Sequence, residues 1–284
     1  MNFRREAYLL AAPALLLFVG IVAIPLVMTL LLSLHEWSSS SGITATIQLG
    51  NYREIFSDSY FAGIFARTLR ISLATTLACI LFGVPEAYIL RRMREPWRSI
   101  MMVVIIGPLL VSVVSRTLGW ALILSGNGLL SQLLLALGLT GTPVSLMFTE
   151  AGVVIALTHV LVPFVVLSVS ASLGHMDPSI ERAAQSLGAG QFTIFRRVVL
   201  PQAMPGILSG TIVVFTLSAS AFATPAIIGG RRLKVAATLA YDEFLNTLNW
   251  PLGAAIAVLL LIGIVVLVVG WNRFVERRYI QVFS

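Results

Sequence analysis

The chain is poor in charged residues and in the residue types that build most catalytic and metal sites. Only 11% of its 284 residues are charged, and it contains one cysteine and three histidines. A single cysteine cannot form a disulfide within the chain. Cys79 lies inside an apolar run, where a small packing residue is expected. His35, His159 and His175 are scattered without the spacing of metal ligands, so no metal site is predicted.

The chain also lacks a phosphate-binding loop and a hydrolytic motif. No G-x-x-x-x-G-K-[ST] sequence is present, and the run G-G-R-R-L-K at 229–234 has neither the spacing nor a following Ser or Thr. No G-x-S-x-G sequence or nucleophile–base pattern occurs among the Ser and Thr residues. We therefore expect this chain to be no enzyme and to hold no cofactor of its own.

Apolar residues, in contrast, make up 58% of the chain, and its mean hydropathy is strongly positive. A soluble domain cannot bury that much apolar surface, so the composition predicts an all-α, polytopic membrane protein. One membrane domain over residues 1–284 with about six transmembrane helices is expected. The predicted spans are 8–34, 68–90, 99–124, 150–173, 203–223 and 251–271. The first run is too long for a signal peptide, and the run at 129–137 is too short to span.

Arginine accounts for almost all of the net charge of +7, since Lys234 is the only lysine. The arginines sit in short loops between apolar runs, which indicates membrane topology rather than nucleic-acid binding. One side holds twelve: Arg4, Arg5, Arg91, Arg92, Arg94, Arg98, Arg182, Arg196, Arg197, Arg273, Arg277 and Arg278. The other holds at most seven basic residues: Arg53, Arg67, Arg70, Arg116, Arg231, Arg232 and Lys234. This bias predicts that both termini and the 177–205 loop are cytoplasmic.

The 177–205 loop is the longest polar segment between two strongly apolar runs. Asp177 is a good N-cap, Pro178 suits the first helical position, and Gly188 is a natural helix stop. A second short helix is predicted over 191–199 and ended by Pro201. The first helix is amphipathic, with apolar residues at Ile180, Ala183, Ala184 and Leu187. Such a hairpin suits either a docking element or an ordinary packed loop.

The spacing within this loop resembles a known motif. The run E-R-A-A-Q-S-L-G, nine residues and V-V-L-P resembles the E-A-A-x-x-x-G-x9-I-x-L-P loop of the permease subunits of bacterial ABC importers. The matching residues are Ala183, Ala184, Gly188, Leu200 and Pro201. Arg182 occupies the position of the motif's Glu, and Glu181 stands one residue earlier. The resemblance implies that this loop couples to an ATPase, with Glu181 rather than Arg182 making the charged contact.

Weaker motifs extend the resemblance to most of the chain. N-Y after the first span, R-x-x-G-W in the third and N-W-P-L-G-A-A at the start of the sixth are similar to the spermidine/putrescine-type branch, which also includes opine and phosphonate permeases. The resemblance implies a type I ABC importer permease fold in the bacterial inner membrane. It implies as partners a second, distinct homologous permease, two ATPase subunits carrying ATP and Mg²⁺, and an extracytoplasmic solute-binding protein. The implied solute is of polyamine or opine type.

Two other functional classes were weighed against this one. An ion-gradient-driven secondary transporter would need paired ionisable residues near the midplane and an internal repeat, and no clear repeat is found. A membrane enzyme would need a catalytic constellation, which the sequence lacks.

Ionisable residues in the spans and outer loops are the candidates for a solute pathway. Arg116, with Trp120 in the same run, lies deep in the third span, where it either lines the pathway or pins two spans together. Tyr241, Asp242 and Glu243 form an acidic and aromatic cluster in an outer loop. This cluster suits a cationic solute, or alternatively a solvated loop that contacts the receptor. Near the cytoplasmic end of the second span, Glu86 is expected to snorkel or to pair with Arg91 or another nearby arginine. His159, in the fourth span, is expected to be packed or hydrogen-bonded.

Overall fold

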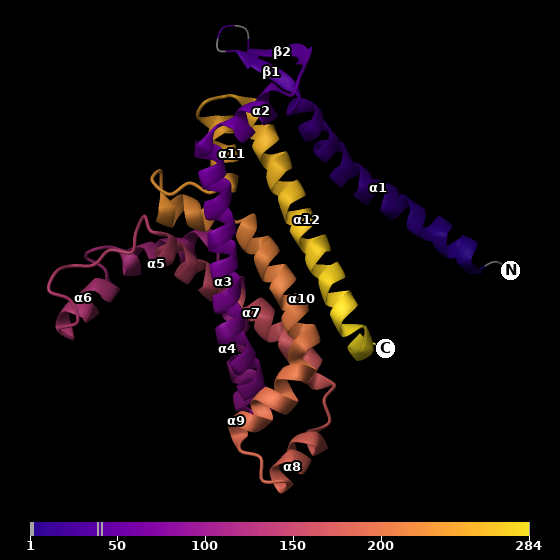
Figure 1. Ribbon diagram of the computed structural model, residues 1–284, viewed down its shortest axis with the longest axis vertical. Helices are drawn as coiled ribbons and strands as arrows, with labels where there is room; N and C mark the ends of the chain where they lie inside the picture. Colours follow the sequence, from indigo (N-terminus) through magenta and orange to yellow (C-terminus); the bar gives the residue numbers. More distant parts are fainter. Residues whose placement is uncertain (1–2, 39, 41, 284) are drawn as a thin grey trace. The chain divides into compact units, whose positions relative to one another are not determined.

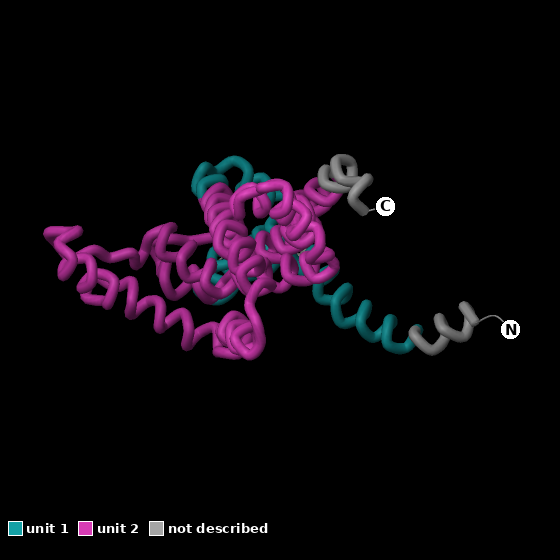
Figure 2. The backbone as a smooth tube through the Cα atoms, turned by 90° about the horizontal axis from the view of Figure 1, so that it is seen from below, with its two compact units in different colours: residues 1–63, 236–263 teal, residues 64–235, 264–284 magenta. Residues whose placement is uncertain are grey.

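The computed structural model describes residues 3–38, 40 and 42–283. It divides into two compact units: residues 1–63 with 236–263, and residues 64–235 with 264–284 (Figure 2). Six helical stretches are long and apolar enough to cross a membrane: Ala12–Leu32, Ser59–Arg92, Val113–Ala136, Glu150–Gly174, Gln191–Ala219 and Trp250–Arg273. The predicted all-α fold with six spans is therefore confirmed. The side chains of Arg4, Arg5, Arg277 and Arg278, counted for topology, lie outside the described part.

The first unit carries a small β-hairpin that the sequence did not predict. Its helices are α1 (Phe3–Leu32), α2 (Gly50–Ser57), the start of α3 (Ser59–Arg92), α11 (Ala236–Leu245) and the start of α12 (Trp250–Phe283). Between α1 and α2, β1 (His35–Ser38) pairs antiparallel with β2 (Gly42–Ile47). Trp37 lies opposite Ile43, and Gly42 has a φ of +70° at the turn. Alternating β-branched residues in the second strand favour this pairing.

Hydrogen bonds join the hairpin to its flanking helices. The Asn51 side-chain amide donates to the carbonyls of Ser33 and His35, at 2.9 Å each. The hydroxyls of Ser33 and Tyr52 are 2.7 Å apart. These bonds satisfy carbonyls at the end of α1 that have no helical partner. The N-Y segment of the sequence therefore fixes the end of α1, the hairpin and the short helix α2 to one another.

The second unit contains the remaining helices, shown in Figure 1. After α3 these are α4 (Trp97–Leu110), α5 (Val113–Leu124), α6 (Leu129–Ala136), α7 (Glu150–Gly174), α8 (Pro178–Ser186), α9 (Gln191–Ile194), the π-turn η1 (Phe195–Val199), α10 (Leu200–Ala219) and the π-turn η2 (Pro225–Gly229). α7 and α10 pack side by side at its centre (Figure 1). A Cβ at Gly206 would lie 2.4 Å from the Ser168 carbonyl oxygen, and one at Gly210 would lie 3.2 Å from the Val165 Cα. The small residues therefore allow the two backbones to approach closely.

The predicted third span, one helix over 99–124, was wrong. The chain becomes extended at Val111 and divides the segment into α4 and α5. The Pro108 carbonyl, in the last turn of α4, accepts a hydrogen bond from Nη1 of Arg116 in α5. In an apolar environment every backbone carbonyl needs a hydrogen-bond donor. At this break in the helix, the Arg116 guanidinium is the donor in place of a helical N–H. This contact favours the interpretation that Arg116 pins two helical segments together.

The prediction that Pro201 ends a helix was also wrong. The helix runs on from α9 through η1 into α10, and the Leu200 N–H bonds to the Phe195 carbonyl, five residues earlier. Pro201 has no N–H to offer to a carbonyl four residues back. The shift to i→i+5 bonding just before the proline lets the helix continue. The fifth span is therefore continuous with the second helix of the 177–205 loop.

Candidate functional site

The predicted first helix of the 177–205 loop is α8. The Asp177 carboxylate accepts a hydrogen bond of 2.8 Å from the Ser179 N–H, and Pro178 occupies the first turn. This bond from the Ser179 N–H holds the pKa of Asp177 below its usual range. At the other end Gly188 has a φ of +80°, a conformation that favours glycine. The N-cap and the glycine stop predicted from the sequence are both confirmed.

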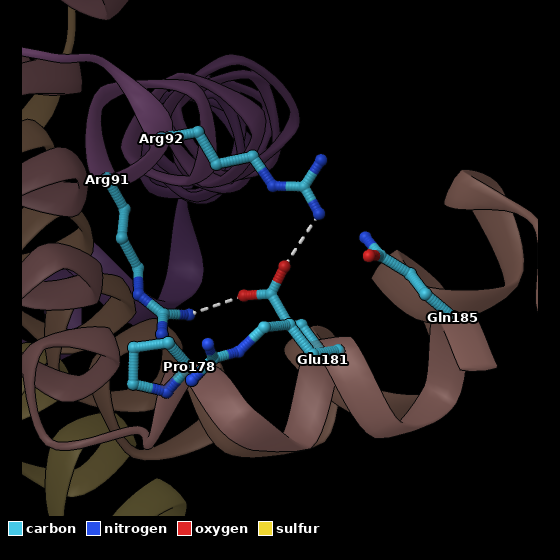
Figure 3. Close-up of a pocket in the computed structure, with 6 residues that line it drawn as sticks. Arg91, Arg92, Pro178, Glu181 and Gln185 are labelled. Carbon is cyan, nitrogen blue, oxygen red and sulfur yellow. Dashed lines mark hydrogen bonds and ion pairs between the residues drawn. The ribbon is translucent and has the colours of Figure 1, made fainter.

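Glu181 faces inward, into an ion-paired cluster at the end of α3 (Figure 3). Its Oε1 lies 2.8 Å from Nη1 of Arg91, and its Oε2 lies 2.6 Å from Nη2 of Arg92. Only 12% of the Glu181 side chain is exposed. The Arg92 guanidinium also stacks 4.5 Å above the centre of the Tyr88 ring. Both oxygens of the carboxylate are therefore engaged within the chain.

The same two arginines reach the segments on either side of α8. Arg91 Nη2 donates to the Met176 carbonyl at 3.0 Å, and Arg92 Nη1 donates to Gln191 Oε1 at 2.7 Å. Charge-assisted bonds of this kind are about twice as strong as neutral ones. The end of α3 is consequently tied to the α7–α8 junction, to α8 and to α9. We call this set, Arg91, Arg92, Glu181 and Gln191, the clasp.

The clasp changes two expectations drawn from the sequence. Arg91 binds Glu181 rather than Glu86, and no ion pair of Glu86 is found in the described part of the chain. With Glu181 held inside, Arg182 is the exposed charge at the start of α8. The contacts of Arg91, Arg92 and Gln191 with the loop were not predicted, because the arginines at 91–98 were counted for topology and Arg91 was assigned to Glu86. The signal that could have found them is an acidic residue on the helix of one predicted cytoplasmic loop and a run of arginines in another.

Three large apolar residues of the loop are exposed, whereas Ile194 and Val199 further along the chain are buried in the core. Leu187 is 88% exposed, Phe192 75% and Ile180 41%. Ala184 is half-buried against the core, as is Leu200, whereas Ala183 and Pro201 are exposed. Exposed large apolar residues are typical of an interaction surface. The first half of the loop thus has the exposed apolar residues expected of a docking element, and the second half packs apolar residues into the core.

The residues considered for a solute pathway lie in both units. In the second unit, Trp120 Nε1 donates to Nδ1 of His159 at 3.1 Å, and the two rings meet edge to face. His159 is therefore hydrogen-bonded, and its side chain is exposed in this chain.

In the first unit, Tyr241, Asp242 and Glu243 lie on α11. Asp242 accepts from the Asn246 amide at 2.8 Å. Glu243 accepts from the Thr247 hydroxyl at 2.5 Å. In the described residues, no group of His, Cys, Asp and Glu could hold a metal ion.

Comparison with known proteins identifies the family. The model of the binding-protein-dependent transport system inner membrane component matches residues 80–281, most of the chain. The chain belongs to this family. Among its relatives, the spermidine/putrescine transport system permease protein PotB of Escherichia coli (strain K12) is 31% identical over 260 residues. These cover 90% of this chain and 94% of PotB. The molybdenum transport system permease protein ModB of Mycobacterium bovis is 31% identical over 202 residues, covering 71% and 75% of the two chains.

Solved structures show the same fold. A bacterial alginate ABC transporter, in complex with an alginate pentasaccharide-bound periplasmic protein, matches with a TM-score of 0.79 at 15% identity. The match covers 96% of this chain and 94% of that one. The MetNI methionine ABC transporter matches with a TM-score of 0.55 at 16% identity, covering 74% and 92%. The family member described here is homologous to the permeases of ABC importers, as the loop motif indicated, and it is an inner-membrane permease rather than an enzyme. A secondary transporter is not favoured.

Proposed function

We propose that this chain forms one half of the solute pathway of an ATP-driven importer and that the 177–205 loop couples it to a separate ATPase. The observation that carries the proposal is an exposed apolar surface, Ile180, Leu187 and Phe192, on helices that ion pairs hold against α3. The remaining subunits are a second, homologous permease chain, two ATPase subunits that bind ATP and Mg²⁺, and an extracytoplasmic solute-binding protein. Residues 1–284 act as one permease domain.

The proposed coupling role depends on a rigid connection between the 177–205 loop and the spans. A force on α8 passes through Glu181 to the end of α3, and through Gln191 to α9 and the continuous helix into α10. Ala183, Ala184 and Arg182 lie on α8, Gly188 forms the joint, and Leu200 and Pro201 lie where the loop enters α10. The loop and both termini are placed in the cytoplasm in this proposal, which the arginine distribution supports. ATP-driven closure of the ATPase pair would then move the spans between two states.

The solute is a small organic molecule of polyamine or opine type. The name of the relative PotB, which shares 31% identity with this chain, supports the polyamine class. On the outer side, Asp242 and Glu243 with Tyr241 offer carboxylates and an aromatic ring to a cationic group. Within the spans, Arg116 and the hydrogen-bonded pair Trp120 and His159 are the pathway candidates.

The test is reconstitution. The complex of this chain with its second permease and ATPase is placed in liposomes with ATP inside, the receptor is added outside, and uptake of radiolabelled spermidine is measured. Mass spectrometry of the solute retained by the receptor identifies the natural cargo. We expect uptake that requires ATP and the ATPase subunits. Uptake by this chain alone, driven by an ion gradient, would overturn the proposal.

A further inference from the structure

The hollow between α8 and the end of α3 carries an excess of positive charge. It has a volume of about 460 Å³ and is lined by Arg91, Arg92, Pro178, Glu181, Arg182 and Gln185. Figure 3 shows the two arginines of α3 reaching the single carboxylate from one side. Three guanidinium groups face one carboxylate, so the lining has a net charge of +2, from three positive charges less one negative.

The charge excess is not neutralised by the rest of the described chain. Both oxygens of Glu181 are taken by Arg91 and Arg92. Arg182 forms no ion pair among the described residues, and the acidic group that acts on it is the exposed Asp177, already bonded to the Ser179 N–H. Guanidinium groups have a planar array of donors that matches a carboxylate. The pocket therefore offers donors to an acidic group that comes from outside the chain.

We propose that this pocket receives an acidic side chain of the ATPase subunit, with Arg182 as its principal partner. The inference rests on the proposed function and adds the sign of the charge: the permease contributes the cation and the ATPase the anion. The neighbouring surface fits a protein partner, because Leu187 and Phe192 expose 88% and 75% of their area beside the pocket's helix. An apolar contact rimmed by a complementary charge pair is the usual composition of a protein interface.

The motif of the family has a glutamate where this chain has Arg182, so the charge at this position is reversed. The inward position of Glu181 explains why a cation faces outward here. Because the carboxylate is bound within the clasp, the next residue, Arg182, is the charged group that α8 presents outward. Replacing Arg182 by glutamate would place a second carboxylate on α8 beside Glu181 and repel the acidic partner. Since Arg182 is exposed, this change leaves the packing of the chain intact.

The experiment uses the full complex in nanodiscs to measure how much ATPase co-purifies with the permease pair, and the same complex in liposomes to measure ATP-driven uptake. Arg182→Glu is compared with Arg98→Glu, which reverses an exposed arginine on α4 outside the pocket. We expect Arg182→Glu to lower ATPase affinity by about tenfold or more, as close interfacial charge pairs do, and Arg98→Glu to leave it near that of the wild type. Scanning the ATPase with Asp→Arg and Glu→Arg changes should reveal one position that restores binding to Arg182→Glu.

Several results would overturn the inference. One is wild-type retention of the ATPase by Arg182→Glu, and another is an equal loss with Arg98→Glu. A third is the absence of any restoring position in the ATPase. A fourth is dependence of the Arg182→Glu effect on anionic lipid, tested in phosphatidylcholine nanodiscs with and without phosphatidylglycerol, which would assign the pocket to a lipid headgroup. If the wild-type complex itself retains no ATPase, the proposed function fails instead.

Discussion

The carboxylate of Glu181 lies 2.8 Å from the guanidinium of Arg91, a residue ninety positions earlier in the chain. This pair joins the short helix α8 to the end of the membrane-spanning helix α3. A partly buried ion pair contributes little net stability by itself, but removing one partner leaves the other charge desolvated and unpaired. The pair therefore matters more for the position of α8 than for the total stability of the fold.

Glu181→Gln should loosen α8 without removing it. The change leaves two guanidinium groups without their carboxylate, and we expect a loss of stability on the order of 2 kcal/mol. ATP hydrolysis by the assembled complex should continue while the solute moved per ATP falls. The measurements are thermal unfolding of the purified complex and the ratio of uptake to hydrolysis. As a matched control, Glu95→Gln alters an exposed acid between α3 and α4 and should change stability by less than about 0.5 kcal/mol. An unchanged ratio in Glu181→Gln would contradict the role of the clasp.

A double-mutant cycle tests the pair directly. Glu181→Gln and Arg91→Gln should be non-additive, with a coupling energy of about 1–2 kcal/mol, because the two side chains are in contact. Glu181→Gln combined with Arg98→Gln should be additive within about 0.5 kcal/mol. Additivity in the first cycle would show that the ion pair carries no energy in the membrane-embedded protein.

Gly188→Asp should uncouple transport while leaving the protein in the membrane. Gly188 has a φ of +80°, where a residue with a Cβ is strained by about 1 kcal/mol or more. The strain shifts the turn after α8 and hence the exposed apolar residues that we propose to meet the ATPase. Gly190→Asp is the control, since Gly190 has a φ of −68° and precedes α9 as its N-cap, a position that favours Asp. We expect normal uptake from Gly190→Asp and continued ATP hydrolysis with little uptake from Gly188→Asp. Normal uptake by Gly188→Asp would count against the coupling loop.

Gly206→Ala should destabilise the contact between α7 and α10. The added Cβ would lie 2.4 Å from the Ser168 carbonyl oxygen, a backbone atom that cannot move aside alone. Overpacking of this kind costs about 1–3 kcal/mol. Gly107→Ala on α4, where nothing lies within 4 Å, should be neutral or slightly stabilising. The readout is the thermal stability of the two variants in detergent, and equal stabilities would refute the close approach.

Arg116→Ala should leave the Pro108 carbonyl unpaired at the break between α4 and α5. An unsatisfied buried carbonyl costs about 1–3 kcal/mol, so lower stability and lower yield are expected. Arg116→Lys retains a cationic donor and should recover part of both. If Arg116 also lines the solute pathway, uptake per assembled complex should fall further than the yield does. Unchanged uptake per complex would show that Arg116 only holds α4 and α5 together and does not line the pathway.

The sequence by itself determined the membrane class, the number of spans and the position of the short helix α8. Long apolar runs must be helical in a bilayer, because no water is present to satisfy the backbone. The N-cap Asp177, Pro178 and Gly188 set the bounds of α8 through local interactions that neighbouring residues decide. Reliance on local rules also explains the wrong prediction at Pro201. A local rule predicts that the helix ends at this proline, whereas the π-turn η1 before it lets the helix continue into α10.

Only the tertiary structure decided which way each charge points. Glu181 and Arg182 are adjacent, and the sequence offers no reason to turn one inward and the other outward. The choice depends on α3 bringing Arg91 and Arg92 to the same place, a long-range contact that a local pattern does not encode. The same holds for Arg116, whose bond to Pro108 exists because the chain bends at Val111. Local sequence sets where helices begin and end, and the packing of distant segments sets the partners of their charges.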